Sequence, residues 1–470
     1  MQDYDIVIGL EVHAELKTKS KVFCSCKNQF GSLPNTNCCP VCVGLPGALP
    51  ILNKKAVELV IKAGLTIDSE INNLAVFERK NYFYPDLAKA YQISQLVRPI
   101  CIGGHIDLKS RRVRINRIHL EEDAGKLVHS SQAIGTLIDY NRGGVPLMEL
   151  VTEPDITSAD EAVEFLTNLR QRYIFADVAE CKMEQGGMRC DVNISVKPKG
   201  SNVLGERTEM KNLNSFKSVH RAITYEANRQ IEILKNGGKI TQETRKWDDN
   251  HGKSISMRKK ETSQDYRYFP DPDLLAVEIS HDEVETIRKT LPMMPEQLKE
   301  RYIKEYGLSE YEANIITKDK AIVDYYNKAI SLYKNPKIVA NWLLTDILSK
   351  IKDEQDSQIK ISPEDLAKIL TLLEQSKITR TVAKDIFAKV WQDGANVDQL
   401  AKSLGGFVDD DSLQNIVKNI VENNQKAVSD YHTSETPEKV FRWFVGQVMK
   451  ETKGKANAQT AEKIIKELLK

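Results

Sequence analysis

Two kinds of hydrophobic periodicity divide the chain. Between residues 4 and 13 every second side chain is apolar, at Ile6, Ile8, Leu10 and Val12. This alternation predicts a β-strand with one buried face. After the proline-rich segment 291–295, apolar residues recur three and four positions apart, as in residues 366–373. That spacing is typical of amphipathic helices.

We therefore predict an α+β protein with three domains, since 470 residues are too many for one core. Residues 1–292 contain short β-type runs and Gly-Gly turns, interrupted by helices predicted at 158–174 and 215–234. We expect a mostly antiparallel sheet there. Residues 293–405 are predicted to form an all-α helical domain, and residues 406–470 a small helical tail domain.

The overall charge predicts no strong attraction to nucleic acid. The chain has 67 Lys and Arg against 66 Asp and Glu, so any such binding requires local patches. The first residues lack the basic and apolar regions of a targeting signal. No apolar run approaches the roughly 18 residues that span a membrane. We expect a cytoplasmic protein without a membrane contact.

The predicted tail is polarised in charge. Residues 407–438 carry 2 basic and 7 acidic side chains, whereas residues 439–470 carry 8 basic and 3 acidic ones. A basic helical unit can bind a phosphate backbone. The alternative is a solvated helix face, and charge alone favours that alternative.

Five of the eight cysteines fall within residues 24–42. Two close pairs, Cys24-x-Cys26 and Cys39-x-x-Cys42, have the spacing of a tetrahedral zinc site, and Cys38 is left over. Four thiolates close the coordination shell, so we predict structural Zn²⁺. The alternative is a set of inert buried thiols.

Glu11 and His13 share the polar face of the first predicted strand, about 7 Å apart at Cα. Together they suit a hard divalent cation or acid–base chemistry, and the zinc prediction leaves them to a different metal. The alternative is the solvent face of an edge strand, which this pattern by itself favours.

Further polar groups lie within β-type runs. Glu149 sits in an apolar run, where a carboxylate is costly to bury unless a cation or donor meets it. Asp191, Asn193 and Ser195 share one strand face, as do Arg207, Glu209 and Lys211. These faces can line a cleft or lie in solvent.

Glu121, Glu122 and Asp123 are three adjacent acids, which indicate a cation site or a surface loop. Lys80 and Tyr82 belong to a run whose aromatic side chains can stack on a base or ribose, although such runs are more often core. The chain has no P-loop and no Gly-x-Gly-x-x-Gly motif, so any nucleotide is bound in another way.

Several long strings resemble the B subunits of the aspartyl/glutamyl-tRNA(Asn/Gln) amidotransferases. They lie at residues 9–13, 80–86, 91–95, 119–126, 139–155, 188–195, 209–216, 265–270 and 444–450. The strings are rare and run from one end of the chain to the other, which makes the resemblance specific. The length leaves no room for the inserted domain of the archaeal relatives, which favours the bacterial type.

The resemblance implies a cradle domain, a helical domain and a tail that engages tRNA. It implies a heterotrimer in which the partners are a glutaminase and a small third protein. With ATP and Mg²⁺, a B subunit phosphorylates the side-chain carboxylate of Glu-tRNA(Gln) or Asp-tRNA(Asn). Ammonia from glutamine then displaces phosphate and gives the amide.

The resemblance also implies roles for single residues. Four positions match magnesium ligands: Glu11, His13, Glu122 and Glu149. Asp191, Glu209 and Lys211 line the catalytic site or the ammonia path, and Arg189 is a candidate phosphate contact. The zinc knuckle of the family matches Cys24, Cys26, Cys39 and Cys42.

Two other functions fit the residues. One is a stand-alone magnesium- and zinc-dependent phosphoryl or nucleotidyl transferase that acts on small carboxylic acids. The other is an RNA-binding scaffold in which the acids are structural. Only the amidotransferase requires misacylated tRNA for ATP hydrolysis and a partner glutaminase for amide formation.

Overall fold

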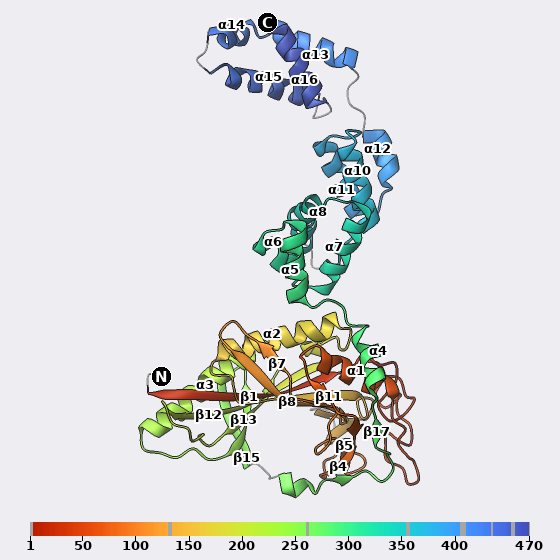
Figure 1. Cartoon of the computed structure of the whole chain (residues 1–470), viewed down its shortest axis with the longest axis vertical. Helices are drawn as coiled ribbons and strands as arrows, with labels where there is room; N and C mark the ends of the chain where they lie inside the picture. Colours follow the sequence, from red (N-terminus) through yellow and green to blue (C-terminus); the bar gives the residue numbers. More distant parts are fainter. Residues whose placement is uncertain are drawn as a thin grey trace. The chain divides into compact units, whose positions relative to one another are not determined.

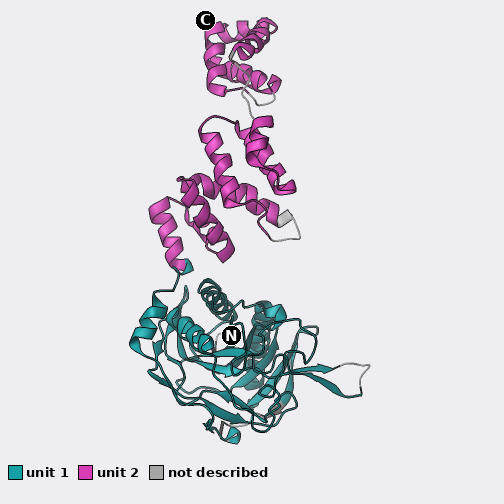
Figure 2. Ribbon diagram, turned by 90° about the vertical axis from the view of Figure 1, so that its right-hand side faces the viewer, with its two compact units in different colours: residues 1–295 teal, residues 296–470 magenta. Residues whose placement is uncertain are grey.

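The computed structural model describes residues 3–129, 134–259, 263–353, 358–404, 410–433, 436–452 and 456–469. The chain forms two compact units, residues 1–295 and 296–470 (Figure 2). The first unit is rich in β-structure and the second is helical (Figure 1), which confirms the predicted α+β class. The predicted boundary at residues 405–406 lies outside the described residues, and the three-domain division stays a prediction.

The first unit is built on a ten-stranded sheet with β1 (Tyr4–Glu15) near its middle. β1 pairs antiparallel with β11 (Pro146–Thr152) and with β12 (Met188–Pro198). Beyond β12, the sheet continues with β13 (Thr208–Leu213), β14 (Glu243–Asp248) and β15 (Lys253–Lys259). Beyond β11, it continues with β8 (Arg112–Glu122), β6 (Cys101–Ile102) and β2 (Glu70–Ile71). A further strand, β7 (His105–Asp107), pairs with β8. These pairs are antiparallel except β13 with β14.

Three small sheets complete the described β-structure of this unit, which also has two 3-10 turns. The sheets join β9 (Lys126–His129) with β10 (Thr136–Asp139), β5 (Tyr91–Ser94) with β4 (Glu78–Asn81) and β16 (Phe269–Pro270), and β3 (Leu74–Ala75) with β17 (Val277–Glu278). The turns span Met183–Gln185 and Ser263–Tyr266.

Helices cover one face of the main sheet (Figure 1). α2 (Ala159–Phe175) and α3 (Phe216–Lys235) pack together, and α3 lies on β12 and β13. Both predicted helices are confirmed, and the Ser158 and Ser215 side chains cap their first turns. The apolar positions of β1 are buried, so its polar positions face the opposite side. α1 (Lys54–Leu65) and α4 (His281–Arg288) complete the described helices of this unit.

The second unit consists of short helices. They are α5 (Pro295–Tyr306), α6 (Glu310–Ile316), α7 (Lys320–Leu332), α8 (Pro336–Trp342), a π-turn (Leu343–Ile347), α9 (Leu348–Asp353), α10 (Pro363–Glu374), α11 (Arg380–Asp393), α12 (Val397–Leu404), α13 (Asp410–Glu422), α14 (Gln425–Thr433), α15 (Pro437–Glu451) and α16 (Ala458–Leu468). Helices α13, α15 and α16 share a core that includes Leu413, Phe444 and Ile465. Along the described residues, no helix combines the length and apolarity that crossing a membrane requires.

Candidate active site

Strand pairing gathers polar side chains on the open face of the main sheet. β1 places His13 opposite Glu149 of β11, and β8 places His119 opposite Glu149. On the other side of β1, Glu11 lies opposite Asp191 of β12. Because cross-strand partners point to the same face, residues far apart in sequence meet here.

The first cluster surrounds His13. Its Nε2 atom lies 3.3 Å from Glu149 Oε2 and 3.6 Å from Glu121 Oε1. His119 Nε2 lies 3.5 Å from both of these acids. One ligand atom each from His13, Glu121 and Glu149 lie within 4.8 Å of one another, so the three residues can hold a metal ion.

The second cluster consists of Glu11, Asp191 and Glu209, whose ligand atoms also lie within 4.8 Å of one another. Asn193 Nδ2 donates to Glu11 Oε1 at 2.8 Å. The Lys211 ammonium contacts Asp191 and lies 3.2 Å from Glu209 Oε1. The cluster thus holds three acids around one internal cation.

The pKa shifts report excess negative charge on this face. Burial, and then the charges of Glu149 and Glu209, raise the pKa of Glu11. Burial alone lowers the pKa of His13, but the hydrogen bond and charge of Glu149, with the charge of Glu121, raise it to about 9. Burial likewise lowers the pKa of Lys211, and the charges of Asp191 and Glu209 outweigh it and raise that pKa. A divalent cation would neutralise this charge.

Both clusters border one cavity of about 1200 Å³. Of the predicted site residues, the cavity is lined by Glu11, His13, Lys80, Tyr82, Glu149, Asp191, Glu209 and Lys211. The Lys80 ammonium lies 5.7 Å from the ring centre of Tyr82 and 5.0 Å from that of Tyr266. The part of the cavity wall formed by these two rings therefore also presents the positive charge of Lys80 to the cavity that the acids line.

The expected convergence of Glu122 with the magnesium ligands is not found. Its Oε1 atom contacts the Lys89 ammonium and accepts from the Ile93 backbone N–H at 2.9 Å. Glu121, and not Glu122, lies with His13 and Glu149 in the first cluster. Alternation along β8 is the reason, because His119 and Glu121 point to the open face and Glu122 points away from it.

Arg189 lies opposite His13 but is engaged by another residue. Its Nη2 atom donates to Asp123 Oδ2 at 2.6 Å, and it is absent from the cavity wall. A phosphate contact by Arg189 would have to compete with this ion pair.

The sequence did not single out Glu121 and His119, whose side chains the structure places in the first cluster. Both are buried, with 4% and 3% of their surface exposed. Their signal was the parity of the run 118–122, which puts two ionisable groups on one face of a strand. The signal was hard to read because Glu121 and Glu122 are adjacent acids, and only their alternation along the strand distinguishes the side chain on the open face from the one on the other face.

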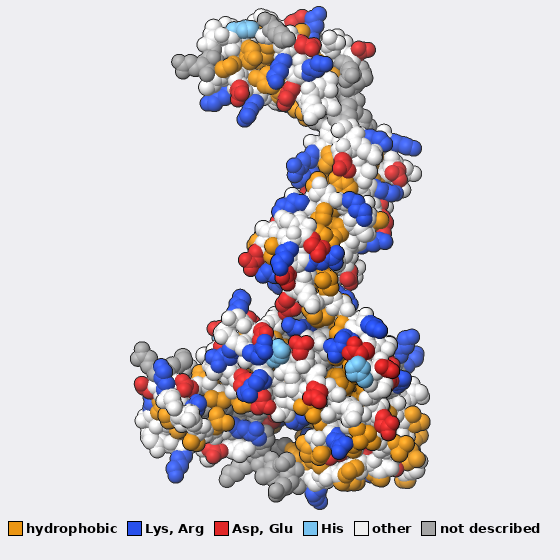
Figure 3. All heavy atoms as spheres, in the orientation of Figure 1, with side chains coloured by type: hydrophobic (Ala, Val, Ile, Leu, Met, Phe, Trp, Pro, Cys, Tyr) orange, Lys and Arg blue, Asp and Glu red, His pale blue; other side chains and the backbone are white. Residues whose placement is uncertain are grey.

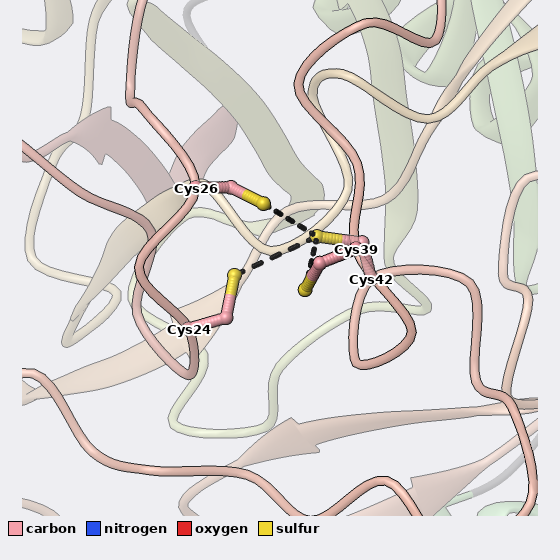
Figure 4. Close-up of side chains that lie close together, drawn as sticks. All are labelled: Cys24, Cys26, Cys39 and Cys42. Atoms are coloured by element: carbon pink, nitrogen blue, oxygen red, sulfur yellow. Dashed lines mark hydrogen bonds between the residues drawn. The ribbon is translucent and has the colours of Figure 1, made fainter.

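The four predicted cysteines converge from two loops (Figure 4). The sulfur of Cys42 lies 3.6 Å from that of Cys24, 3.8 Å from that of Cys39 and 3.9 Å from that of Cys26. Four sulfurs at Zn–S distances of about 2.3 Å in a tetrahedron are separated by about 3.8 Å. The residues therefore fit zinc, while Cys38 lies outside the quartet beside Asn141.

The hydrogen bond with Cys24 lowers the pKa of Cys42 to about 4, and Lys21 contributes to the same shift against the effect of burial. The same hydrogen bond raises the pKa of Cys24, and burial raises that of Cys26 to about 11. A thiolate at neutral pH is the form that binds a metal. The site is thus suited to a cation by charge as well as by spacing.

Comparison with known proteins agrees with this geometry. A model of the GatB/GatE catalytic domain matches residues 6–285, and a model of the GatB domain matches residues 324–469. The B subunit of the aspartyl/glutamyl-tRNA(Asn/Gln) amidotransferase from Caldicellulosiruptor bescii is 50% identical over 478 aligned positions, which cover 99% of each sequence. The proteins of the same name from Caldanaerobacter subterraneus and Persephonella marina are 47% and 46% identical, over at least 99% of each sequence. The chain therefore belongs to the family formed by the B subunits of the aspartyl/glutamyl-tRNA(Asn/Gln) amidotransferases.

Proposed function

We propose that the chain activates the side-chain carboxylate of Glu-tRNA(Gln), Asp-tRNA(Asn) or both by phosphorylating it with ATP. Ammonia that a partner glutaminase releases from glutamine then forms the amide, so the complex is a glutamine-hydrolysing carbon–nitrogen ligase. The observation that carries this proposal is the pair of acidic clusters on the wall of one cavity.

The chemistry explains why such a site is needed. A carboxylate is a poor electrophile, so its oxygen first forms a bond to the γ-phosphorus of ATP as the bond to ADP breaks. Ammonia then attacks the carbonyl carbon, loses a proton, and inorganic phosphate leaves. Mg²⁺, when bound, neutralises the charge of the transferring phosphate.

The residues of the two clusters have distinct parts in this proposal. His13, Glu121 and Glu149 bind one cation, and Glu11, Asp191 and Glu209 bind a second or orient the reacting carboxylate. Lys211 holds Asp191 and Glu209 in place through its ion pairs.

Lys80 and Tyr82 are the proposed nucleotide contacts on the cavity wall. A second cavity of about 460 Å³ shares Glu11 with the first and is also lined by Gly9, Ser195 and Arg207. A volume of this order suits a nucleotide-sized ligand. ATP bound across the two cavities would bring its phosphates to the acidic clusters.

An exposed apolar surface supports binding of the two proposed protein partners, the glutaminase and the small third protein of the heterotrimer. Leu33, Leu49 and Ile51 are 76%, 59% and 77% exposed, and Phe83 is 86% exposed. Hydrophobic side chains gather at the lower right of the N-terminal unit in Figure 3. Apolar surface of this kind is typical of protein–protein contacts.

One side of α15 supports binding of misacylated tRNA by the tail. Lys439, Arg442 and Lys450 are exposed, and their spacing of three and eight residues places them on the same side of the helix. Trp443, 41% exposed, lies beside them. Cations next to an exposed aromatic ring suit a phosphate backbone with accessible bases. The helical domain is proposed to extend this contact.

Replacing Glu149 by Gln should lower the transamidation rate of the reconstituted complex by about 100-fold or more. The change removes a charged ligand, and several kcal/mol of phosphate stabilisation depend on the cation. The matched control is Glu153→Gln, because Glu153 lies beyond the end of the same strand and contacts Asn116. A normal rate for Glu149→Gln would refute the metal assignment.

Glu121→Gln and Glu122→Gln should differ in their need for metal. Glu121→Gln should raise the Mg²⁺ concentration for half-maximal activity about 10-fold or more, since Glu121 belongs to the cation cluster. Glu122→Gln should leave that concentration unchanged, because Glu122 contacts Lys89. Mg²⁺ titrations at saturating ATP measure both. The reverse order would return Glu122 to the metal site.

Changing Lys439, Arg442 and Lys450 together to Ala should weaken tRNA binding and reduce its salt dependence by about one unit of slope per lost phosphate contact. A triple change of Lys54, Lys55 and Lys239, exposed residues of the first unit, serves as control. Binding of labelled tRNA is measured across a salt series. If removal of residues 406–470 also leaves affinity unchanged, the tail does not bind tRNA.

A further inference from the structure

Lys21 is a fully buried lysine at the start of the four-cysteine centre. Its side chain is among the largest of the completely buried ones, with 0% exposure. The Nζ atom donates to Cys42 Sγ at 3.3 Å and to the Tyr140 backbone oxygen at 3.2 Å. Among the residues that the structure describes, no carboxylate lies within ion-pair distance of this ammonium.

A buried ammonium is costly unless negative charge meets it. Cysteines that keep their protons supply no such charge, and a lone thiolate at Cys42 supplies one. Four thiolates around Zn²⁺ carry a net charge of about −2, since four negative charges outnumber two positive ones. The metal-loaded centre therefore meets the Lys21 ammonium with more negative charge than the four cysteines do without a metal.

Lys21 also reaches the loop that leads into β11. Its neighbour Val22 donates to the Gly144 oxygen at 2.9 Å. From the cysteine loop, the Asn37 backbone N–H donates to Asn141 Oδ1 at 2.8 Å. This loop ends at β11, the strand that carries Glu149.

We propose that Lys21 is the buried counter-charge of the zinc centre and a positioning residue that ties the centre to the loop at residues 139–145. The inference rests on the proposed zinc site. In it, Lys21 offsets part of the charge of the four thiolates and holds Cys42 against the Tyr140 carbonyl.

The test compares zinc affinity in the full-length reduced chain. Lys21→Met removes the charge and keeps the length of the side chain, and Lys21→Gln removes the charge but keeps a hydrogen-bond donor. Lys19→Met is the control, because Lys19 lies two residues away and is exposed. Competition with a chromophoric chelator gives the dissociation constants.

We expect Lys21→Met and Lys21→Gln to weaken zinc binding about 10- to 100-fold, as loss of a partner to a metal ligand does. Lys19→Met should bind as the unmodified chain does. If Lys21→Gln retains full affinity, the charge of Lys21 is not the cause. If all three variants bind zinc normally, the inference is wrong although the zinc site stands.

Thermal unfolding separates this role from a merely structural one. Lys21→Met should unfold at a lower temperature than the unmodified chain when zinc is bound. With zinc removed, its midpoint should be equal or higher, because a buried ammonium that meets less negative charge than in the zinc-bound state is gone and Tyr140 still accepts from Gly143. A lower midpoint in both states would overturn the proposal. If the unmodified chain binds no zinc, both the zinc site and the role of Lys21 fall together.

Discussion

The pairing of β1 with β11 on one side and β12 on the other is the constraint on which the active site depends. It brings Glu149 and Asp191, from distant parts of the chain, to His13 and Glu11. A slip of β1 by one residue would turn Glu11 and His13 toward the helices, away from Asp191 and Glu149. The buried apolar face of β1 opposes such a shift, because the same slip would expose Ile8 and Leu10.

That register concentrates charge that the protein must balance. Several carboxylates lie within reach of one another, with the imidazoles of His13 and His119 and the ammonium of Lys211 beside them. Burial and then the charge of Glu149 raise the pKa of Glu11, whereas Glu149 and Glu121 raise the pKa of His13 against the effect of burial. Such a concentration of carboxylates is costly for a protein without bound cations. Both clusters border a cavity of about 1200 Å³ from which a cation can reach them.

The sequence predicted those parts of the site that depend on local parity. Glu11 and His13 were placed on one face because a strand alternates strictly, and the cysteine pairs were recognised because zinc ligands need short spacings. Glu122 lies away from the acidic clusters because alternation along β8 puts His119 and Glu121 on the open face, and the run of three acids does not by itself show which of them takes that face. The ion pair of Arg189 could not be predicted from a local pattern either, because its partner Asp123 lies 66 residues away in the sequence.

The four-cysteine centre and the acidic clusters are joined through the backbone. The loop at residues 139–145 takes hydrogen bonds from the cysteine loop and then becomes β11. On its other side, Arg142 donates to the Ala124 and Gly125 oxygens just after β8. Both strands that supply acids to the His13 cluster therefore begin or end at contacts with this loop. A metal bound by the four cysteines would therefore restrain, through this loop, the two strands whose acids must keep their positions in the cluster.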